Sequence, residues 1–338
     1  MLLLLVNLYL EKKYPTEYKG AKGTVMKKGI IILSTLFVLL AAGFIYQKVS
    51  VGIDLKSYKP VGQLYPIGDK MMHIYTGGSG DFTVLFGTGW GTANPYADFY
   101  PLYNEVSKHA KFAVYDRFGY GYSDITDKKR DIDTIVDEIH ELLNKSGQKP
   151  PYILVGHSLA SLETIRFTQK YKNEVKGIVL IDGGNPEYYV NQKPVTVISI
   201  FQKQLISFGI ARLLYKIDSF EASINSERNT LKLLPYKLKE LDKTSTLIKA
   251  NNDNIIDEMR RSQSNAKKVV DGGWLGNIPL TVITAGNFGQ VSQSWLDSQE
   301  KLKDWSTSGK QFIVKDSKHY IHQYEPEIIV NEILKIAE

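Results

Sequence analysis

The pentapeptide Gly-His-Ser-Leu-Ala at residues 156–160 has the residue types and spacing of an activated serine nucleophile. It follows a short apolar run and precedes a helical pattern, so the serine is expected at a sharp strand-to-helix turn. Such a turn needs small residues two positions before and after the serine, and Gly156 and Ala160 supply them. The turn exposes the hydroxyl of Ser158 at the amino end of a helix, which favours developing negative charge. We therefore expect Ser158 to be a nucleophile; a serine that merely caps a helix is the alternative.

A serine hydroxyl needs a general base, which we expect after the last strand of the fold. His319 lies in the segment Ser-Lys-His-Tyr-Ile at residues 317–321, directly after a short strand predicted at 312–314. It is the predicted base, and His322 is the alternative. The remaining four of the six histidines are expected in packing or surface positions or, in the turn itself, pointing elsewhere: His73, His109, His140 and His157.

The elements that must position these residues alternate between short apolar strands and amphipathic helices. Strands are predicted at 63–67, 70–76, 82–86, 111–115, 152–155, 175–181, 280–284 and 312–314, and helices at 132–143, at 159–171 and from Pro326 onward. Strands rich in Val, Ile and Leu between such helices predict an α/β fold with a mostly parallel sheet and helices on both faces. Residues 187–276 interrupt the alternation with helical sequence and predict a lid over the site.

Three segments in this order resemble motifs of the α/β-hydrolase family. The Phe-Gly-Thr-Gly-Trp segment at 86–90 resembles the oxyanion loop, and the Tyr-Asp-Arg-Phe-Gly-Tyr-Gly-Tyr-Ser segment at 115–123 resembles the signature turn after the fourth strand. Residues 317–321 resemble the loop that carries the catalytic histidine. The resemblance covers residues 60–338, and it implies an α/β-hydrolase sheet with a helical lid insertion.

The resemblance also bears on the oxyanion hole and on the acid that would orient the histidine. It implies that the backbone N–H groups of Trp90 and Leu159 form the oxyanion hole. Most members carry an aspartate after the penultimate strand, where this chain has Asn287. Some members take their acid one strand closer to the serine, and Asp182 stands there. Asp182 is therefore the predicted acid; Asp297, another residue or no true acid remain the alternatives.

Composition and charge narrow the functional class further. The chain has 338 residues, no cysteine and a formal net charge of +6. The lack of cysteine excludes disulfides, thiolate metal sites and a thiol nucleophile. Residues 1–50 carry a net charge of +5, which leaves +1 for the rest, and the predicted lid holds +4. Because no basic stripe or nucleotide or metal motif is present, we expect no nucleic-acid partner, cofactor or metal.

The basic residues near the start flank an apolar run. Residues 29–46 are uncharged and apolar, and a membrane span takes about 20 such residues. Lys27 and Lys28 before the run predict a cytoplasmic amino terminus and an extracytoplasmic hydrolase. A cleaved signal peptide, which would give a secreted enzyme, and a buried core helix are the alternatives.

Four segments follow from these patterns. Residues 1–28 are a basic segment, and the Met-Lys-Lys at 26–28 resembles the start of an exported protein, so the residues before Met26 are expected to precede the true start. Residues 29–46 are the span or signal anchor, 47–59 a polar linker, and 60–338 the hydrolase domain.

The sequence predicts a single-pass, membrane-anchored serine hydrolase that cleaves a carboxylic ester with an apolar part by acyl transfer. The expected partners are a small-molecule ester and the membrane, while the pattern does not determine the oligomeric state. An amide or peptide hydrolase of aminopeptidase type and a C–C bond hydrolase are alternatives. A non-catalytic, surface-anchored binding module on the same fold is the alternative from another class.

Overall fold

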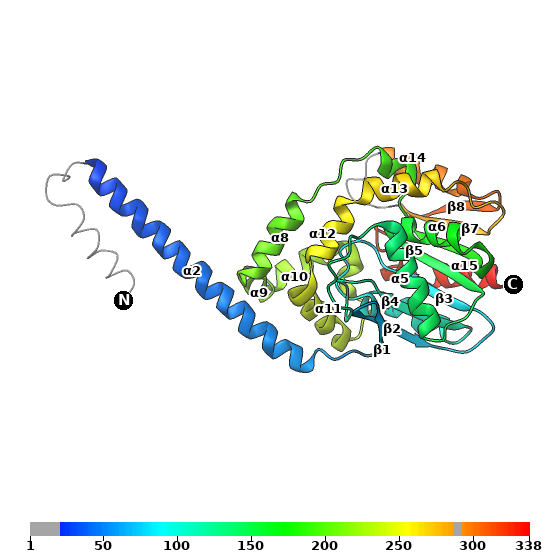
Figure 1. The fold of residues 1–338 in the computed structure, drawn as a ribbon, viewed down its shortest axis with the longest axis horizontal. Coiled ribbons are helices and arrows are strands. Elements are labelled where there is room, and N and C mark those ends of the chain that lie inside the picture. Colours follow the sequence, from blue (N-terminus) through cyan, green and yellow to red (C-terminus); the bar gives the residue numbers. More distant parts are fainter. Residues whose placement is uncertain (1–20, 287–292) are drawn as a thin grey trace.

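A computed structural model describes residues 21–286 and 293–338, and its centre is an eight-stranded sheet (Figure 1). The strands are β1 (Gln63–Ile67), β2 (Lys70–Gly77), β3 (Thr83–Gly87), β4 (Lys111–Asp116), β5 (Tyr152–His157), β6 (Val175–Ile181), β7 (Leu280–Ala285) and β8 (Gly309–Val314). Their order is β1-β2-β4-β3-β5-β6-β7-β8. The hairpin β1–β2 and the pair β2–β4 are antiparallel, and every pair from β4 to β8 is parallel. The predicted mostly parallel sheet is therefore confirmed.

Helices cover both faces of this sheet because its strands are apolar on both sides. In β3, Leu85 packs into one core cluster while Val84 and Phe86 pack into the other, as the twofold alternation of a strand requires. The first cluster lies under α5 and α6, and the second lies under α4 and α15. Between and after the strands, the helices outside the insertion are α3 (Pro95–Asp98), α4 (Tyr100–Val106), α5 (Ile132–Lys145), α6 (Ala160–Lys170), α14 (Gln293–Leu302) and α15 (Pro326–Ala337), with 3-10 turns at Lys172–Glu174, Lys303–Trp305 and Ile321–Gln323.

A helical insertion separates β6 from β7. It contains α7 (Pro186–Val190), α8 (Val197–Ser207), α9 (Ile210–Leu214), α10 (Asp218–Ile224), a 3-10 segment (Ser226–Leu231), α11 (Tyr236–Lys249), α12 (Asp253–Arg260) and α13 (Ser262–Asp271). Figure 1 shows α8 to α12 between the sheet and the long helix α2. The insertion occupies the stretch predicted as a lid at 187–276.

The helix α2 (Ala21–Ser57) projects away from the rest of the molecule (Figure 1). An 18-residue window of its segment Lys27–Ser57 has a mean hydropathy of 2.4 and none of that window is buried, so the length and composition of the segment would allow it to span a membrane. Residues 1–20, most of the predicted basic segment 1–28, lie outside the described residues.

The segment 47–59, predicted as a linker, is helical as far as Ser57. Polar contacts hold it to the insertion: Arg212 donates to Gln47 Oε1 at 2.9 Å and pairs with Asp54 at 2.7 Å, and Gln47 Nε2 donates to the carbonyl of Leu247 at 2.8 Å. The helix ends shortly before Pro60, where the residue preceding a proline disfavours helical geometry. The polar residues thus serve as contacts of a continuing helix.

Candidate active site

Ser158 directly follows β5, at the carboxyl ends of the parallel strands, where α/β sheets generally bind their ligands. Its φ is +54°, a left-handed conformation that residues other than glycine rarely adopt. Two backbone hydrogen bonds hold the turn: Ser158 N–H donates to the carbonyl of Ile181 at 3.1 Å, and Gly184 N–H donates to the carbonyl of Ser158 at 3.0 Å. These bonds hold the strained turn against the end of the neighbouring strand β6. Backbone strain at an active site persists only where the surrounding structure fixes it in this way.

Asp182 and His319 lie against each other although 137 positions separate them in the sequence. His319 Nδ1 is 2.6 Å from Asp182 Oδ2, and Asp182 Oδ1 accepts from the N–H of Ala285 at 3.1 Å. Asp182 is fully buried and also has a positive φ, +42°. Both carboxylate oxygens are therefore fixed, and the short contact is of the kind made by a charge-assisted hydrogen bond. Because Nδ1 faces the carboxylate, Nε2 is the ring nitrogen that base chemistry would use.

The structure places the alternative residues elsewhere. Asp297 is exposed on α14 and accepts from Gln293 at 2.8 Å. His322 is fully buried, with Nε2 3.0 Å from Asp98 Oδ2. Asn287 lies outside the described residues. Of the residues weighed from sequence, the structure thus brings Asp182 and His319 together beside the serine turn.

The loop after β3 approaches the serine turn so closely that Gly89 tolerates no side chain. A Cβ there would lie 2.6 Å from His157 Nδ1 and 3.1 Å from Ser158 Cβ. Among the described residues, neither the backbone N–H of Trp90 nor that of Leu159 donates to another protein atom. The loop is held by side chains instead, since the Trp90 indole N–H donates to the carbonyl of Ile255 at 2.8 Å. Both predicted oxyanion donors are therefore available at the serine turn.

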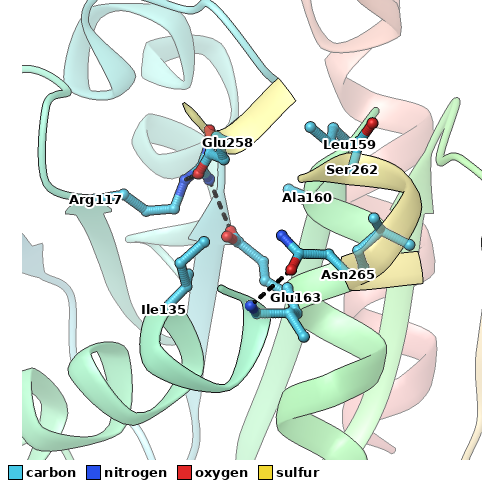
Figure 2. A pocket seen from close by; sticks show the side chains of 10 residues that line it. Arg117, Ile135, Leu159, Ala160, Glu163, Glu258, Ser262 and Asn265 are labelled. Carbon is cyan, nitrogen blue, oxygen red and sulfur yellow. Dashed lines mark hydrogen bonds and ion pairs between the residues drawn. The ribbon is translucent and has the colours of Figure 1, made fainter. Parts of the chain in front are cut away.

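A buried charged cluster that the sequence analysis did not single out supports this loop. Arg117 donates to the carbonyl of Thr88, to Glu163 and to Glu258, each at 2.8 Å. Figure 2 shows Arg117 between the two carboxylates, Glu163 on α6 and Glu258 on α12 of the insertion. Tyr115 also donates to Glu163 at 2.8 Å. One guanidinium thus links the oxyanion loop, the helix behind Ser158 and the insertion.

The cluster holds one more buried carboxylate than buried cation. Burial raises the pKa of Glu163 to about 7; Arg117 acts in the opposite direction and the charge of Glu258 acts in the same one. The cavity drawn in Figure 2 lies beside this cluster and measures about 20 Å³, room for about one water molecule. Neither Ser158 nor His319 lines it, so it is a packing gap behind the turn and not a substrate site.

Tyr189 and His157 are further neighbours of the site that sequence spacing did not reveal. Tyr189 packs on Gly184, where a Cβ would come within 2.1 Å of its ring. Burial raises the pKa of Tyr189, and a hydrogen bond with the Ser158 side chain acts in the opposite direction. His157 is fully buried, and its Nε2 is 3.2 Å from the backbone oxygen of His319. His157 therefore helps to place the loop that carries His319.

The described residues contain no group of three or more His, Asp or Glu side chains arranged as metal ligands. The buried acidic and histidine side chains described above are instead paired with protein groups. The strand tips assemble a strained serine turn, an aspartate–histidine pair and two backbone N–H groups that donate to none of the described residues, which are the parts that acyl transfer requires.

Comparison with known proteins agrees with this arrangement. Residues 83–326 match the family described as alpha/beta hydrolase fold. The Bacillus subtilis (strain 168) proteins YbdG and YqjL are 32% and 25% identical; the alignments cover 90% and 75% of this chain and 94% and 82% of theirs. The Burkholderia xenovorans LB400 enol-lactonase is similar in structure, with a TM-score of 0.61, 12% identity and coverage of 81% of this chain and 99% of its own. The chain belongs to the alpha/beta hydrolase family.

Proposed function

We propose that this hydrolase cleaves a carboxylic ester with an apolar part by acyl transfer, with Ser158 as nucleophile, His319 as general base and Asp182 as the orienting acid. The observation that carries the proposal is the 2.6 Å contact between His319 Nδ1 and buried Asp182 beside the strained serine turn. A buried carboxylate in this position fixes the tautomer of the imidazole and stabilises the imidazolium that forms during the reaction.

The reaction proceeds through an acyl-enzyme. Ser158 Oγ attacks the ester carbonyl carbon while His319 Nε2 takes the hydroxyl proton. The N–H groups of Trp90 and Leu159 donate to the oxyanion of the tetrahedral intermediate. The C–O bond then breaks, and His319 returns the proton to the departing alkoxide, which leaves as an alcohol. Water, deprotonated by His319, attacks the acyl-enzyme, and the acid is released as Ser158 regains its proton.

The nucleophile and the surroundings of the site support the choice of an ester. Haloalkane dehalogenases and epoxide hydrolases of this fold use an aspartate nucleophile, whereas this chain has Ser158 at the turn. The structural neighbours include an esterase from Thermogutta terrifontis; at 16% identity, this similarity shows a shared fold only. The apolar insertion beside the site and the apolar helix α2 favour an ester with an apolar part over a peptide.

Labelling with a fluorophosphonate tests the chemistry directly. Wild type, Ser158→Ala and the control Ser264→Ala, which changes an exposed serine on α13, are treated in parallel. We expect labelling of wild type and Ser264→Ala and none of Ser158→Ala. Absence of labelling in wild type would favour the non-catalytic binding module. A panel of p-nitrophenyl esters of increasing acyl length then tests the apolar part, and a matching p-nitroanilide panel tests amide hydrolysis.

The proposed location is a membrane, with α2 as a single uncleaved span and the hydrolase on the extracytoplasmic side. Its support is the apolar length of α2, the lysines Lys27 and Lys28 before the apolar run, and the packing of Gly43 of α2 against Phe208. The intact mass of the protein from the membrane fraction tests this. Recovery from the medium of a chain that lacks the residues before Gly43 would establish the secreted alternative.

A further inference from the structure

The helix α8 has its apolar side turned outward. Val197, Ile198 and Phe201 are 74%, 63% and 61% exposed. Leu205 continues the same stripe at helical spacing, and Phe208 follows it at the end of the helix. Isolated exposed apolar residues are ordinary, but a continuous stripe marks a surface that binds another apolar phase.

The opposite side of α8 faces the protein and carries mostly polar side chains. Ser199 is 2% exposed, and Lys203 reaches Asp253 of α12 with Nζ 2.5 Å from Oδ1. A helix of a water-soluble domain shows the reverse arrangement, with its apolar stripe on the core and its polar side in water. The orientation of α8 is therefore that of a helix whose outer surroundings are apolar.

The apolar stripe of α8 leads directly to α2. A Cβ on Gly43 of α2 would lie 2.3 Å from the carbonyl oxygen of Phe208, and one on Gly209 would lie 2.9 Å from the carbonyl oxygen of Gly43. Figure 1 shows α8 leaving this contact sideways, so it does not run along α2. Phe44, Ile45 and Val49 of α2 are exposed next to the contact. Both helices thus expose apolar side chains near this contact, at the carboxyl end of the apolar run 29–46.

We propose that the outward face of α8 lies in the boundary between lipid and water, with Val197, Ile198 and Phe201 among the acyl chains. This inference rests on the proposed anchoring by α2. If α2 crosses the bilayer, its contact with Phe208 sets α8 at the level where the apolar run ends. A helix at that depth, lying across the span, has the geometry of an interfacial amphipathic helix. The bilayer is the occupant because the stripe continues the lipid-facing surface of α2.

The test uses the natural absence of cysteine. Single cysteines at three exposed sites receive the environment-sensitive fluorophore NBD, and the full chain is reconstituted in vesicles of phosphatidylcholine and phosphatidylglycerol. Phe201→Cys reports on α8, and Leu36→Cys reports on α2. Trp274→Cys is the matched control, because Trp274 is 63% exposed but precedes β7, at the amino ends of the parallel strands. Hydrolysis of a short water-soluble ester verifies that each labelled variant is folded.

Spin-labelled lipids supply the readout. We expect a shallow spin label to quench the probe at position 201 at least about twofold more than the probe at position 274, as burial in the interface requires. A deep spin label should quench the probe at position 36. Quenching at 36 with equal values at 201 and 274 would overturn the placement of α8 and leave the anchor standing. No quenching at 36 would overturn the anchor and, with it, this inference.

A protein partner predicts a different result. If a second copy covered α8, the probe at position 201 would be shielded from water but unquenched by lipid, and its emission would depend on the ratio of protein to lipid. That outcome would overturn the bilayer as occupant. Blue-shifted emission together with lipid quenching, both independent of that ratio, would support it.

Discussion

The cluster behind the serine turn and the helix α8 bury opposite kinds of side chain. Behind the turn, Arg117, Glu163 and Glu258 are almost wholly removed from solvent, and each charge is paired. On α8, apolar side chains such as Phe201 face outward while Ser199 is enclosed.

The difference teaches what each region is built to do. A buried charge is costly unless it is paired, so the cluster is tolerated only in a fixed geometry, and that geometry holds the oxyanion loop through the carbonyl of Thr88. Outward apolar groups on α8 cost nothing if the phase outside is also apolar. The first region fixes the position of the oxyanion loop, and the second region is suited to contact with an apolar phase.

The largest effect should come from the acid of the site. Asp182→Asn should lower kcat by about 10⁴-fold, because an amide favours the wrong imidazole tautomer at Nδ1. Asp297→Asn, on an exposed helix, should leave kcat and its pH profile unchanged. Steady-state hydrolysis of a p-nitrophenyl ester between pH 5 and 9 makes the comparison. A fully active Asp182→Asn enzyme would remove Asp182 from the proposed mechanism.

Removal of the buried cation should cost stability. Arg117→Met leaves Glu163 and Glu258 without their partner, and breaking such a pair typically costs about 3–5 kcal/mol of unfolding free energy. Arg260→Met is the control: its side chain is exposed beside Asp257, and such a surface pair contributes about 0–1 kcal/mol. Urea unfolding of both variants measures the difference. Equal losses would mean that the cluster does not carry the structural role assigned to it.

The raised pKa of Glu163 predicts a pH-dependent stability. Between its ordinary value of 4.5 and the folded value of about 7, the folded protein binds a proton that the unfolded chain has lost. Stability should therefore fall as pH rises through this window, by about 2–3 kcal/mol between pH 5 and pH 8. Glu163→Gln lacks the titration, so the wild-type unfolding free energy minus that of the variant should fall by this amount. A difference that stays constant with pH contradicts the assignment.

The smallest effect concerns α8. Phe201→Ser in the detergent-solubilised full chain should change the unfolding free energy by no more than about 0.5 kcal/mol, because the ring has no protein core to leave. Phe86→Ala, a fully buried ring in β3, should cost about 3–5 kcal/mol. A loss of unfolding free energy at Phe201 as large as that at Phe86 would show that this face of α8 packs on protein, which would contradict its outward orientation.

Most of the sheet could be predicted from sequence because a strand is encoded locally. The run 175–181 is bounded in the structure as Val175–Ile181, and the strand predicted at 312–314 begins three residues earlier, where Gly309 and Lys310 carry no apolar signal. The meeting of the strand ends also follows from local order, because parallel strands present their carboxyl ends at one edge. Asp182 itself was predicted from the family resemblance, because some members carry their acid at the end of this strand.

The remainder depends on partners far away in sequence. Glu163 on α6 has the same local context as a surface glutamate, and only the fold brings Arg117 to it. The polarity of Gln47 and Asp54 predicted a linker. The sequence gives no sign that both residues contact Arg212 of the insertion. The oxyanion segment 86–90 was recognisable, but its hydrogen bond to the insertion, from Trp90 to Ile255, depends on the tertiary fold.

The length of α2 has a kinetic consequence on the proposed topology. Its 37 residues extend for about 55 Å at about 1.5 Å per residue, while the hydrocarbon of a bilayer takes about 30 Å. The last turns contact the insertion through Gln47 and Asp54, so we expect α2 to hold the hydrolase rigidly and not as a flexible linker. The active site then stays at a constant distance from the bilayer. The rate at which it meets a membrane-bound ester should therefore scale with the amount of ester per unit membrane area. For an ester that partitions into the bilayer, dilution with inert lipid should therefore slow turnover, whereas dilution of the whole suspension should not.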